Sequence, residues 1–366
     1  MPAEWEPHEA TWIGWPRTKS DWPGRFAPIP WAYGEIVRKL APGEQVRIIA
    51  GDRAHEARAR RVLKRVGVDE ERIQFFRFPT DRGWTRDFGP IFVRSRGSES
   101  RARSSSWRAR RAPQTPSARA SDLAIARFRF NGWAKYPDWR KDDRVPERAA
   151  RALRLPLVDV RAPGRPVVLE GGSIDVNGRG SLLTTEECLL DPAVQVRNPG
   201  LGRADLEAVF REYLGAPNVM WLGRGIAGDD THGHVDDLCR FVSAQTLVLC
   251  REKDARDANY RPLEENRERL QGMRLEGGSR PQVVDLPMPA PLFFAGRRLP
   301  ASYANFYIAN AAVLVPTFND PADRVALGVL AELFRDRPVV GIHAVELVWG
   351  LGTLHCLTQQ QPTRKT

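Results

Sequence analysis

Short apolar runs alternate with amphipathic stretches along most of the chain. Runs that are apolar, or apolar at every second position, predict strands at 47–50, 73–78, 90–93, 124–130, 167–169, 182–184, 241–249 and 311–316. Apolar residues spaced three or four apart predict helices at 33–40, 55–66, 144–154, 203–214, 262–271 and 321–334. This alternation indicates an α/β fold, and the absence of a linker between two halves predicts one domain over 1–366.

Segment 94–121 breaks the pattern. It holds eight Arg and eight Ser, with Glu99 as its one acid and Trp107 as its one large apolar residue. Such a composition buries too little apolar surface to order itself, so we expect a disordered insertion loop between two strands. The loop carries +7 of the net charge of +11. The excess positive charge is therefore local, and a nucleic-acid-binding role would rest on this loop alone.

The rest of the composition narrows the class of protein. No apolar run reaches the roughly 18 residues that a membrane span requires. The first residues, Met-Pro-Ala-Glu-Trp-Glu-Pro, do not resemble a secretory signal, so we expect a cytoplasmic protein. The four cysteines lack any CxxC spacing, which disfavours a zinc ribbon. Cys188, Cys239 and Cys250 lie in apolar runs and are expected to be buried, whereas Cys356 lies beside His355 after a glycine-interrupted stretch.

Four polar clusters next to glycines are candidates for chemistry. They are 83–90, with Arg86 and Asp87; 169–175, with Glu170 before two glycines; 228–237, with two histidines and four acids; and 350–362, with Cys356. If 232–236 is extended, His232, His234 and Asp236 share one face. That set predicts either a metal site of a metal-dependent hydrolase or an acid–base pair.

The same inventory suits attack on a guanidinium carbon without a metal. That cation is stabilised by resonance and needs a soft nucleophile such as a thiolate, and paired carboxylates can hold its flat fork of donors. A histidine can then protonate the departing ammonia and activate the water.

The motifs also resemble those of a known family along nearly the whole chain. The sequence is similar to the agmatine deiminase family, with its bacterial peptidyl-arginine deiminase relatives, in the guanidino-group-modifying superfamily. The resemblance is carried by Trp84-Thr-Arg-Asp-Phe-Gly-Pro, Phe130-Asn-Gly-Trp, Leu169-Glu-Gly-Gly-Ser, Gly228-Asp-Asp-Thr-His-Gly-His-Val-Asp, Ser302-Tyr-Ala-Asn-Phe-Tyr-Ile-Ala-Asn and Leu354-His-Cys-Leu-Thr-Gln-Gln-Gln-Pro. It implies a five-bladed, pseudosymmetric α/β propeller of the pentein type, with the site on the central axis.

The resemblance also assigns roles. It implies that Cys356 is the nucleophile that forms an amidino-thioether, and that His234 is the general acid and base. Glu170 would position the guanidinium and the histidine. Asp87 and Asp236 would grip the guanidinium nitrogens. Substrate contacts are implied for Trp84 and Asn305.

The favoured substrate is agmatine, which would give N-carbamoylputrescine and ammonia on a polyamine route. Free arginine and peptidyl-arginine are the alternatives within the family. The resemblance implies no cofactor, no metal, no nucleic acid and no membrane partner, and it leaves a homo-oligomer open. Two departures from the family pattern stand out: many relatives carry Asp or Asn where His232 stands here, and the Arg/Ser-rich insertion is atypical.

Overall fold

Five sheets repeat one strand pattern in the computed structural model, which describes residues 1–94 and 122–364. In each sheet a first strand runs antiparallel to a second, and the second runs parallel to a third. The sheets are β4 (Ile91–Arg94), β5 (Leu123–Arg127) and β6 (Leu157–Asp159); β9 (Asp175–Val176), β10 (Ser181–Thr185) and β11 (Asn218–Leu222); β12 (Cys239–Phe241), β13 (Thr246–Arg251) and β14 (Gln282–Pro287); β17 (Tyr307–Ile308), β18 (Val313–Thr317) and β19 (Val339–His343); and β20 (Thr358–Pro362), β1 (His8–Gly14) and β2 (Gln45–Ile49), with β3 (Ile73–Phe76) added beside β2.

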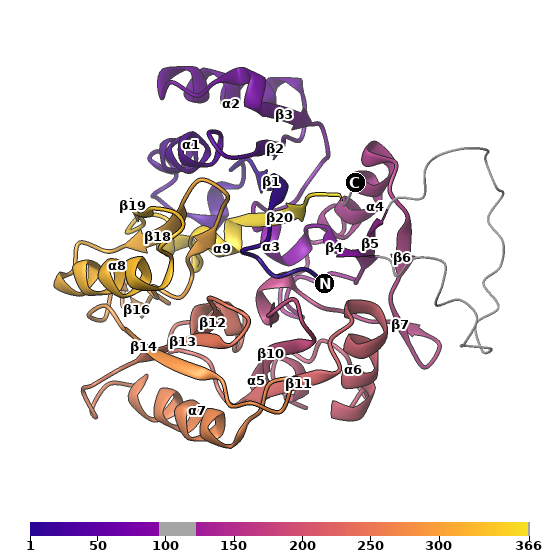
Figure 1. The fold of residues 1–366 in the computed structure, drawn as a ribbon. Coiled ribbons are helices and arrows are strands. Elements are labelled where there is room, and N and C mark those ends of the chain that lie inside the picture. The colour runs from indigo at the N-terminus through magenta and orange to yellow at the C-terminus, as the bar shows by residue number, and fades with distance from the viewer. Residues whose placement is uncertain (95–121, 365–366) are drawn as a thin grey trace.

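The second and third strands of every sheet are connected through helix. These connections contain α4 (Val145–Leu153); α5 (Glu186–Leu190) with α6 (Arg203–Val209) and the π-helical turn Phe210–Leu214; α7 (Tyr260–Gly272); α8 (Pro321–Leu333); and α1 (Ile29–Leu40). Parallel neighbours require such a crossover, which explains the alternating sequence pattern. In Figure 1, α2 (Arg53–Arg65), α6, α7 and α8 lie at the periphery, and the short α3 (Thr85–Phe88) and α9 (Leu354–Leu357) lie near the centre.

The two ends of the chain meet in one sheet. Strand β1 pairs with β20 in antiparallel register, so that Ala10 lies opposite Gln361. The first and second strands of the sheets are buried more deeply than the third; all five residues of β20 and of β10 are buried, whereas β6 and β19 are partly exposed. Helix starts follow the expected local chemistry: Asp320 accepts a hydrogen bond from the Ala322 amide and precedes Pro321 at the start of α8. Among the described residues, no helix is long and apolar enough to cross a bilayer.

Two strand predictions were wrong. Segment 241–249 forms the end of β12, a turn and β13, because Ser243 accepts a hydrogen bond from the Thr246 amide and reverses the chain. Segment 167–169 makes only a single bridge, between Val168 and Arg129. The predicted helices are confirmed with shifted ends. The predicted insertion loop falls, apart from Arg94 in β4, outside the described residues.

Candidate active site

Each of the five sheets contributes one or two polar residues from the segment just before its first strand, and these residues lie close together. Asp87 lies in α3 before β4, and Glu170 directly precedes the turn that leads into β9. His234 and Asp236 precede β12, Asn305 precedes β17, and Cys356 in α9 precedes β20. Each segment thus occupies the same place in its own strand pattern. All of these side chains are buried, with exposed fractions of 5% or less.

A cavity of about 250 Å³ leads to this group. Asp87 and Cys356 line it, and so does Trp84, whose ring lies 5.2 Å from that of Trp22. Aromatic rings make much of the wall: besides Trp84, these are Trp133, Tyr136 and Trp349. The cavity therefore offers apolar sides for a slender substrate and places acid and thiol groups in its lining.

Cys356 is held by its surroundings as a thiol. Burial raises the pKa of this thiol well above its ordinary value, and the carboxylates of Asp236, Asp237 and Asp87 raise it further. The Asn305 amide, whose Nδ2 lies 3.1 Å from the sulfur, acts in the opposite direction. A cation that entered the site would offset the carboxylates and favour the thiolate.

Asn305 fastens the cysteine loop. Its Oδ1 accepts hydrogen bonds from the amide nitrogens of Thr353 and His355, at 3.2 and 3.1 Å. Its Nδ2 donates to Asp237 as well as to Cys356. Asn305 is not among the residues that line the cavity. Its hydrogen bonds make it a clamp on α9, and the substrate contact implied for it stays a prediction.

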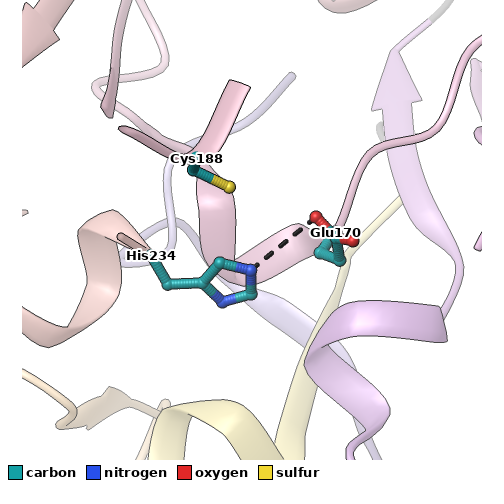
Figure 2. A group of neighbouring side chains, drawn as sticks. All are labelled: Glu170, Cys188 and His234. Atoms are coloured by element: carbon teal, nitrogen blue, oxygen red, sulfur yellow. Dashed lines mark ion pairs between the residues drawn. The ribbon is translucent and has the colours of Figure 1, made fainter. Parts of the chain in front are cut away.

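His234 is fully buried among three carboxylates. Its Nδ1 lies 3.7 Å from Asp87 Oδ1 and 3.9 Å from Asp236 Oδ1. Its Nε2 lies 3.7 Å from Glu170 Oε2 (Figure 2). Burial alone would lower the pKa of His234. The Asp87 carboxylate, the Cys188 thiol and Glu170 outweigh burial and hold that pKa well above its usual value. The ring is therefore a proton donor near neutral pH.

Glu170 is ionised on the far side of the ring. Its Oε1 accepts a hydrogen bond from Arg197 Nε at 3.2 Å, and both side chains are fully buried. Burial would raise the pKa of Glu170, but Arg197 and His234 lower it to about 2. A carboxylate that stays charged can orient the imidazolium throughout a reaction cycle.

Asp87 and Asp236 face the same space from two sheets. Asp87 accepts hydrogen bonds from Trp133 Nε1 at 2.9 Å and from the Gly172 amide at 3.2 Å. Burial, reinforced by nearby carboxylates, raises its pKa to about 6. Asp236 Oδ2 accepts a hydrogen bond from His355 Nδ1 at 2.6 Å, while its Oδ1 has no hydrogen-bond partner among the described residues.

Gly172 leaves room at the centre of this group. A Cβ atom added there would lie 2.6 Å from His234 Nδ1, 2.9 Å from Asp87 Oδ1 and 3.0 Å from an Asp236 oxygen. Any side chain at position 172 would push these groups apart. The double glycine of the sequence thus serves close approach of functional groups.

A paired network lies behind Asp236. Glu4, from the N-terminal segment, contacts Arg86 at 3.0 Å, Arg240 at 2.9 Å and His355 Nε2 at 2.8 Å. We call these four residues the Glu4 network. Arg86 and His355 are the direct neighbours of Asp87 and Cys356 in the chain, so the network fixes the backbone that carries the site.

The structure separates the metal ligands suggested by the sequence. Residues 235–237 form a 3₁₀ turn, and His232 has a positive φ of 63°. Segment 232–236 is therefore not extended, and the condition under which His232, His234 and Asp236 would share one face is not met. The His232 ring turns to Asp191, at 2.9 Å, and away from His234. Among the described residues, two other groups have ligand atoms close enough for an ion: Glu170, Cys188 and His234 (Figure 2), and Asp236, Asp237 and Cys356.

The outer cavity carries charges of both signs. Arg82 pairs with Asp21 at 2.8 Å, and Arg297 pairs with Asp230. Asp21 Oδ2 is buried at the wall without a hydrogen-bond partner in the described part of the chain. Burial raises the pKa of Asp21 to about 7.

Several residues of the site escaped the sequence analysis. Glu4, Arg197 and Trp133 bond to site residues from distant segments. Cys188 was predicted as a buried apolar residue of a strand; it is buried, but it lies in α5 next to His234. His355 carried a usable signal, since it lies next to the candidate nucleophile.

Solved structures of known proteins share this fold. The Enterococcus faecalis agmatine deiminase structure superposes with a TM-score of 0.83 at 27% identity, covering 100% of this chain and 96% of that one. A C. jejuni agmatine deiminase structure gives a TM-score of 0.75 at 27% identity, covering 99% and 95%. The fold and the buried site define a single α/β domain of the pentein type.

Comparison of the sequence with family models and with curated proteins identifies the family of this chain. The family model described as Porphyromonas-type peptidyl-arginine deiminase matches residues 1–362. The agmatine deiminase of Stutzerimonas stutzeri is 34% identical, covering 99% of this chain and 95% of that protein. That of Pseudomonas aeruginosa is 33% identical over the same shares. The chain therefore belongs to the Porphyromonas-type peptidyl-arginine deiminase family, as the motif resemblance indicated.

Proposed function

We propose that this protein hydrolyses the guanidino group of agmatine to N-carbamoylputrescine and ammonia, on a route to putrescine and polyamines. The observation that carries the proposal is the gathering of one thiol, one buried histidine and three carboxylates around Gly172 and the cavity. The curated relatives named agmatine deiminase support agmatine as the substrate.

The proposed binding step uses Asp87 and Asp236. A guanidinium has two edges of N–H donors, and carboxylates on two sides can each accept from one edge. Asp236 Oδ1 is free of other partners within the described residues, and Trp133 and Gly172 orient Asp87. The bound cation would stabilise a thiolate at Cys356, against the burial that raises its pKa. Trp84 would pack beside the flat guanidinium in the cavity.

The proposed chemical steps pass one proton through His234. The Cys356 thiolate attacks the guanidino carbon, and His234 protonates the departing ammonia as the C–N bond breaks. Water then attacks the carbon of the resulting amidino-thioether and forms a C–O bond while His234 takes one of its protons; its other proton is lost as the ureido carbonyl forms. The C–S bond breaks and releases the ureido product with the thiolate restored. Glu170 keeps the imidazole oriented in both steps, since Arg197 holds it ionised.

A second part of the proposal concerns the arrangement of the five sheets. We propose that the five repeated sheets are the five blades of a pseudosymmetric propeller, supported by their common strand order and by the equivalent position of the five site segments. We propose that residues 1–366 form this one domain. The cytoplasmic location, the insertion loop and a homo-oligomer stay predictions.

An assay for the ureido product tests the substrate. The enzyme would be offered agmatine, free arginine and a blocked arginine peptide at equal concentrations. We expect the highest kcat/KM with agmatine. Strong turnover of the peptide with none of agmatine would overturn the choice of agmatine and would leave deimination itself in place.

A further inference from the structure

Cys188 is a buried thiol next to the acid–base histidine, and the proposed chemistry does not use it. Its sulfur, a His234 ring nitrogen and a Glu170 carboxylate oxygen all lie within 4.8 Å of one another. Figure 2 shows the sulfur pointing toward the edge of the ring on which Glu170 is paired. All three side chains are buried, and within the described part of the chain neither His234 ring nitrogen has a hydrogen-bond partner, so the thiol is a close neighbour of the ring and not bonded to it.

The chain holds this thiol rigidly relative to the ring. Thr185, at the start of α5, accepts a hydrogen bond from the Cys188 amide at 3.1 Å. The same hydroxyl donates to the carbonyl of Gly233, the residue before His234, at 2.5 Å. Glu187 accepts from the Gly225 amide at 2.6 Å. The first turn of α5 and the histidine segment therefore form one unit.

A thiol suits a ring that changes its protonation state. Sulfur is a weak acceptor and S–H a weak donor, so the group can face an imidazolium N–H or the lone pair of a neutral imidazole. The carboxylates around the ring favour only the charged form. The groups that face His234 are Asp87 from α3, Glu170 from the turn before β9, Cys188 from α5 and, from its own segment, Asp229, Asp236 and Asp237.

We propose that Cys188 is a positioning residue of the deimination reaction: its sulfur fixes the His234 ring against Glu170 and supports the proton that the ring carries. The inference rests on the proposed function of His234. It makes Cys188 distinct from Cys239, a second fully buried cysteine that makes no hydrogen bond or ion pair with the site residues in the described part of the chain.

Substitution at Cys188 tests the inference. Cys188→Val replaces the thiol with an apolar, somewhat larger side chain, and Cys188→Ser keeps a donor and acceptor. Cys239→Val is the matched control, because it adds the same volume at another buried cysteine. We expect Cys188→Val to lower kcat about tenfold or more with little change in KM, since misplacing an acid–base group costs rate. Because Cys188 helps to raise the pKa of His234, the alkaline limb of its kcat–pH profile should move to lower pH. Cys188→Ser should keep kcat within about threefold of wild type and keep the limb near its wild-type position.

Two results would overturn the inference. One is a Cys188→Val enzyme whose kcat and pH profile match those of Cys239→Val. The other is equal loss in the Ser and Val variants with an unmoved alkaline limb, which would mark a structural role. Wild-type turnover of agmatine in the same assay tests the proposed function separately. The Cys188 comparison is made on whichever guanidino substrate the wild type turns over.

Discussion

The Asp236 carboxylate joins two regions that are built differently. Its Oδ2 accepts a hydrogen bond from His355 in the Glu4 network, where Glu4 pairs with two arginines, and it also lies 3.8 Å from the Cys356 sulfur. Oδ1 faces the front cluster, by which we mean Cys356, His234, Glu170, Asp87 and Asp236 itself. There, Oδ1, Glu170 Oε2 and both His234 ring nitrogens have no hydrogen-bond partner among the described residues.

This difference indicates that the Glu4 network positions the site residues, whereas the front cluster contains the groups proposed to react. Buried polar groups normally have partners, and leaving one unpaired costs about 1–3 kcal/mol. The Glu4 network pairs its charges, although Arg240 Nε has no hydrogen-bond partner among the described residues, and it fixes the backbone on which the site is carried. The front cluster keeps polar atoms without partners, Asp236 Oδ1 among them, behind Asp87 and Cys356, which line the cavity. We therefore propose that the paired region supports one whose polar atoms gain partners when substrate binds.

The largest expected effect comes from filling the front cluster. Gly172→Ala would place a methyl group within 3.0 Å of His234, Asp87 and Asp236. We expect kcat/KM to fall about 100-fold or more, since displaced catalytic groups lose their alignment. Gly328→Ala is the control, because a Cβ at Gly328 meets nothing within 4 Å. Equal activity of the two variants would contradict the central place given to Gly172.

A second substitution breaks the Glu4 network. His355→Gln removes the ring that bridges Glu4 and Asp236, at 2.8 and 2.6 Å. Leaving a buried polar group without its hydrogen bond costs about 1–3 kcal/mol, measurable as the free energy of unfolding in urea. We also expect KM for the guanidino substrate to rise, because Asp236 loses its orientation. The control is His343→Gln, since His343 is exposed and pairs only with Glu346 among the described residues. Wild-type KM and stability in His355→Gln would show that the network does not position Asp236.

A smaller effect is expected in the pH dependence of kcat/KM, which distinguishes Asp87 from Glu170. The pKa of Asp87 is raised to about 6, so lowering the pH through this value protonates a group proposed to grip the substrate. In the profile of kcat/KM, which reports the free enzyme, we expect a fall of about tenfold per pH unit below this value. Glu170, with its pKa near 2, should stay ionised over the same range. A kcat/KM that is constant from pH 7 to about 5 would remove Asp87 from this role.

Much of the site could be predicted from the sequence because its residues lie in short local motifs. Asp87, Glu170, His234 and Cys356 each stand beside glycines or turns just before a first strand. These local motifs can be recognised in the sequence without knowledge of the fold. Hydrophobic periodicity likewise predicted the α/β class and most helices. The five-fold repetition of the sheets was implied by family resemblance alone.

The partners of these residues could not be predicted in the same way. Glu4 lies 351 positions from His355, and Arg197 lies 27 from Glu170. Only the topology of the sheets brings them together. Segment 232–236 is not extended, because Asp229 accepts hydrogen bonds from the amides of Gly233 and His234 and curls the segment. Such a turn leaves no trace in the alternation of side chains.

The central claim is that Cys356 forms a covalent intermediate on the guanidino carbon. The most direct measurement is mass spectrometry of wild type and Cys356→Ala, acid-quenched during turnover of agmatine. We predict a wild-type peptide containing Cys356 whose mass rises by that of agmatine less ammonia. We also predict neither adduct nor ureido product from Cys356→Ala. Full activity of Cys356→Ala would contradict the account.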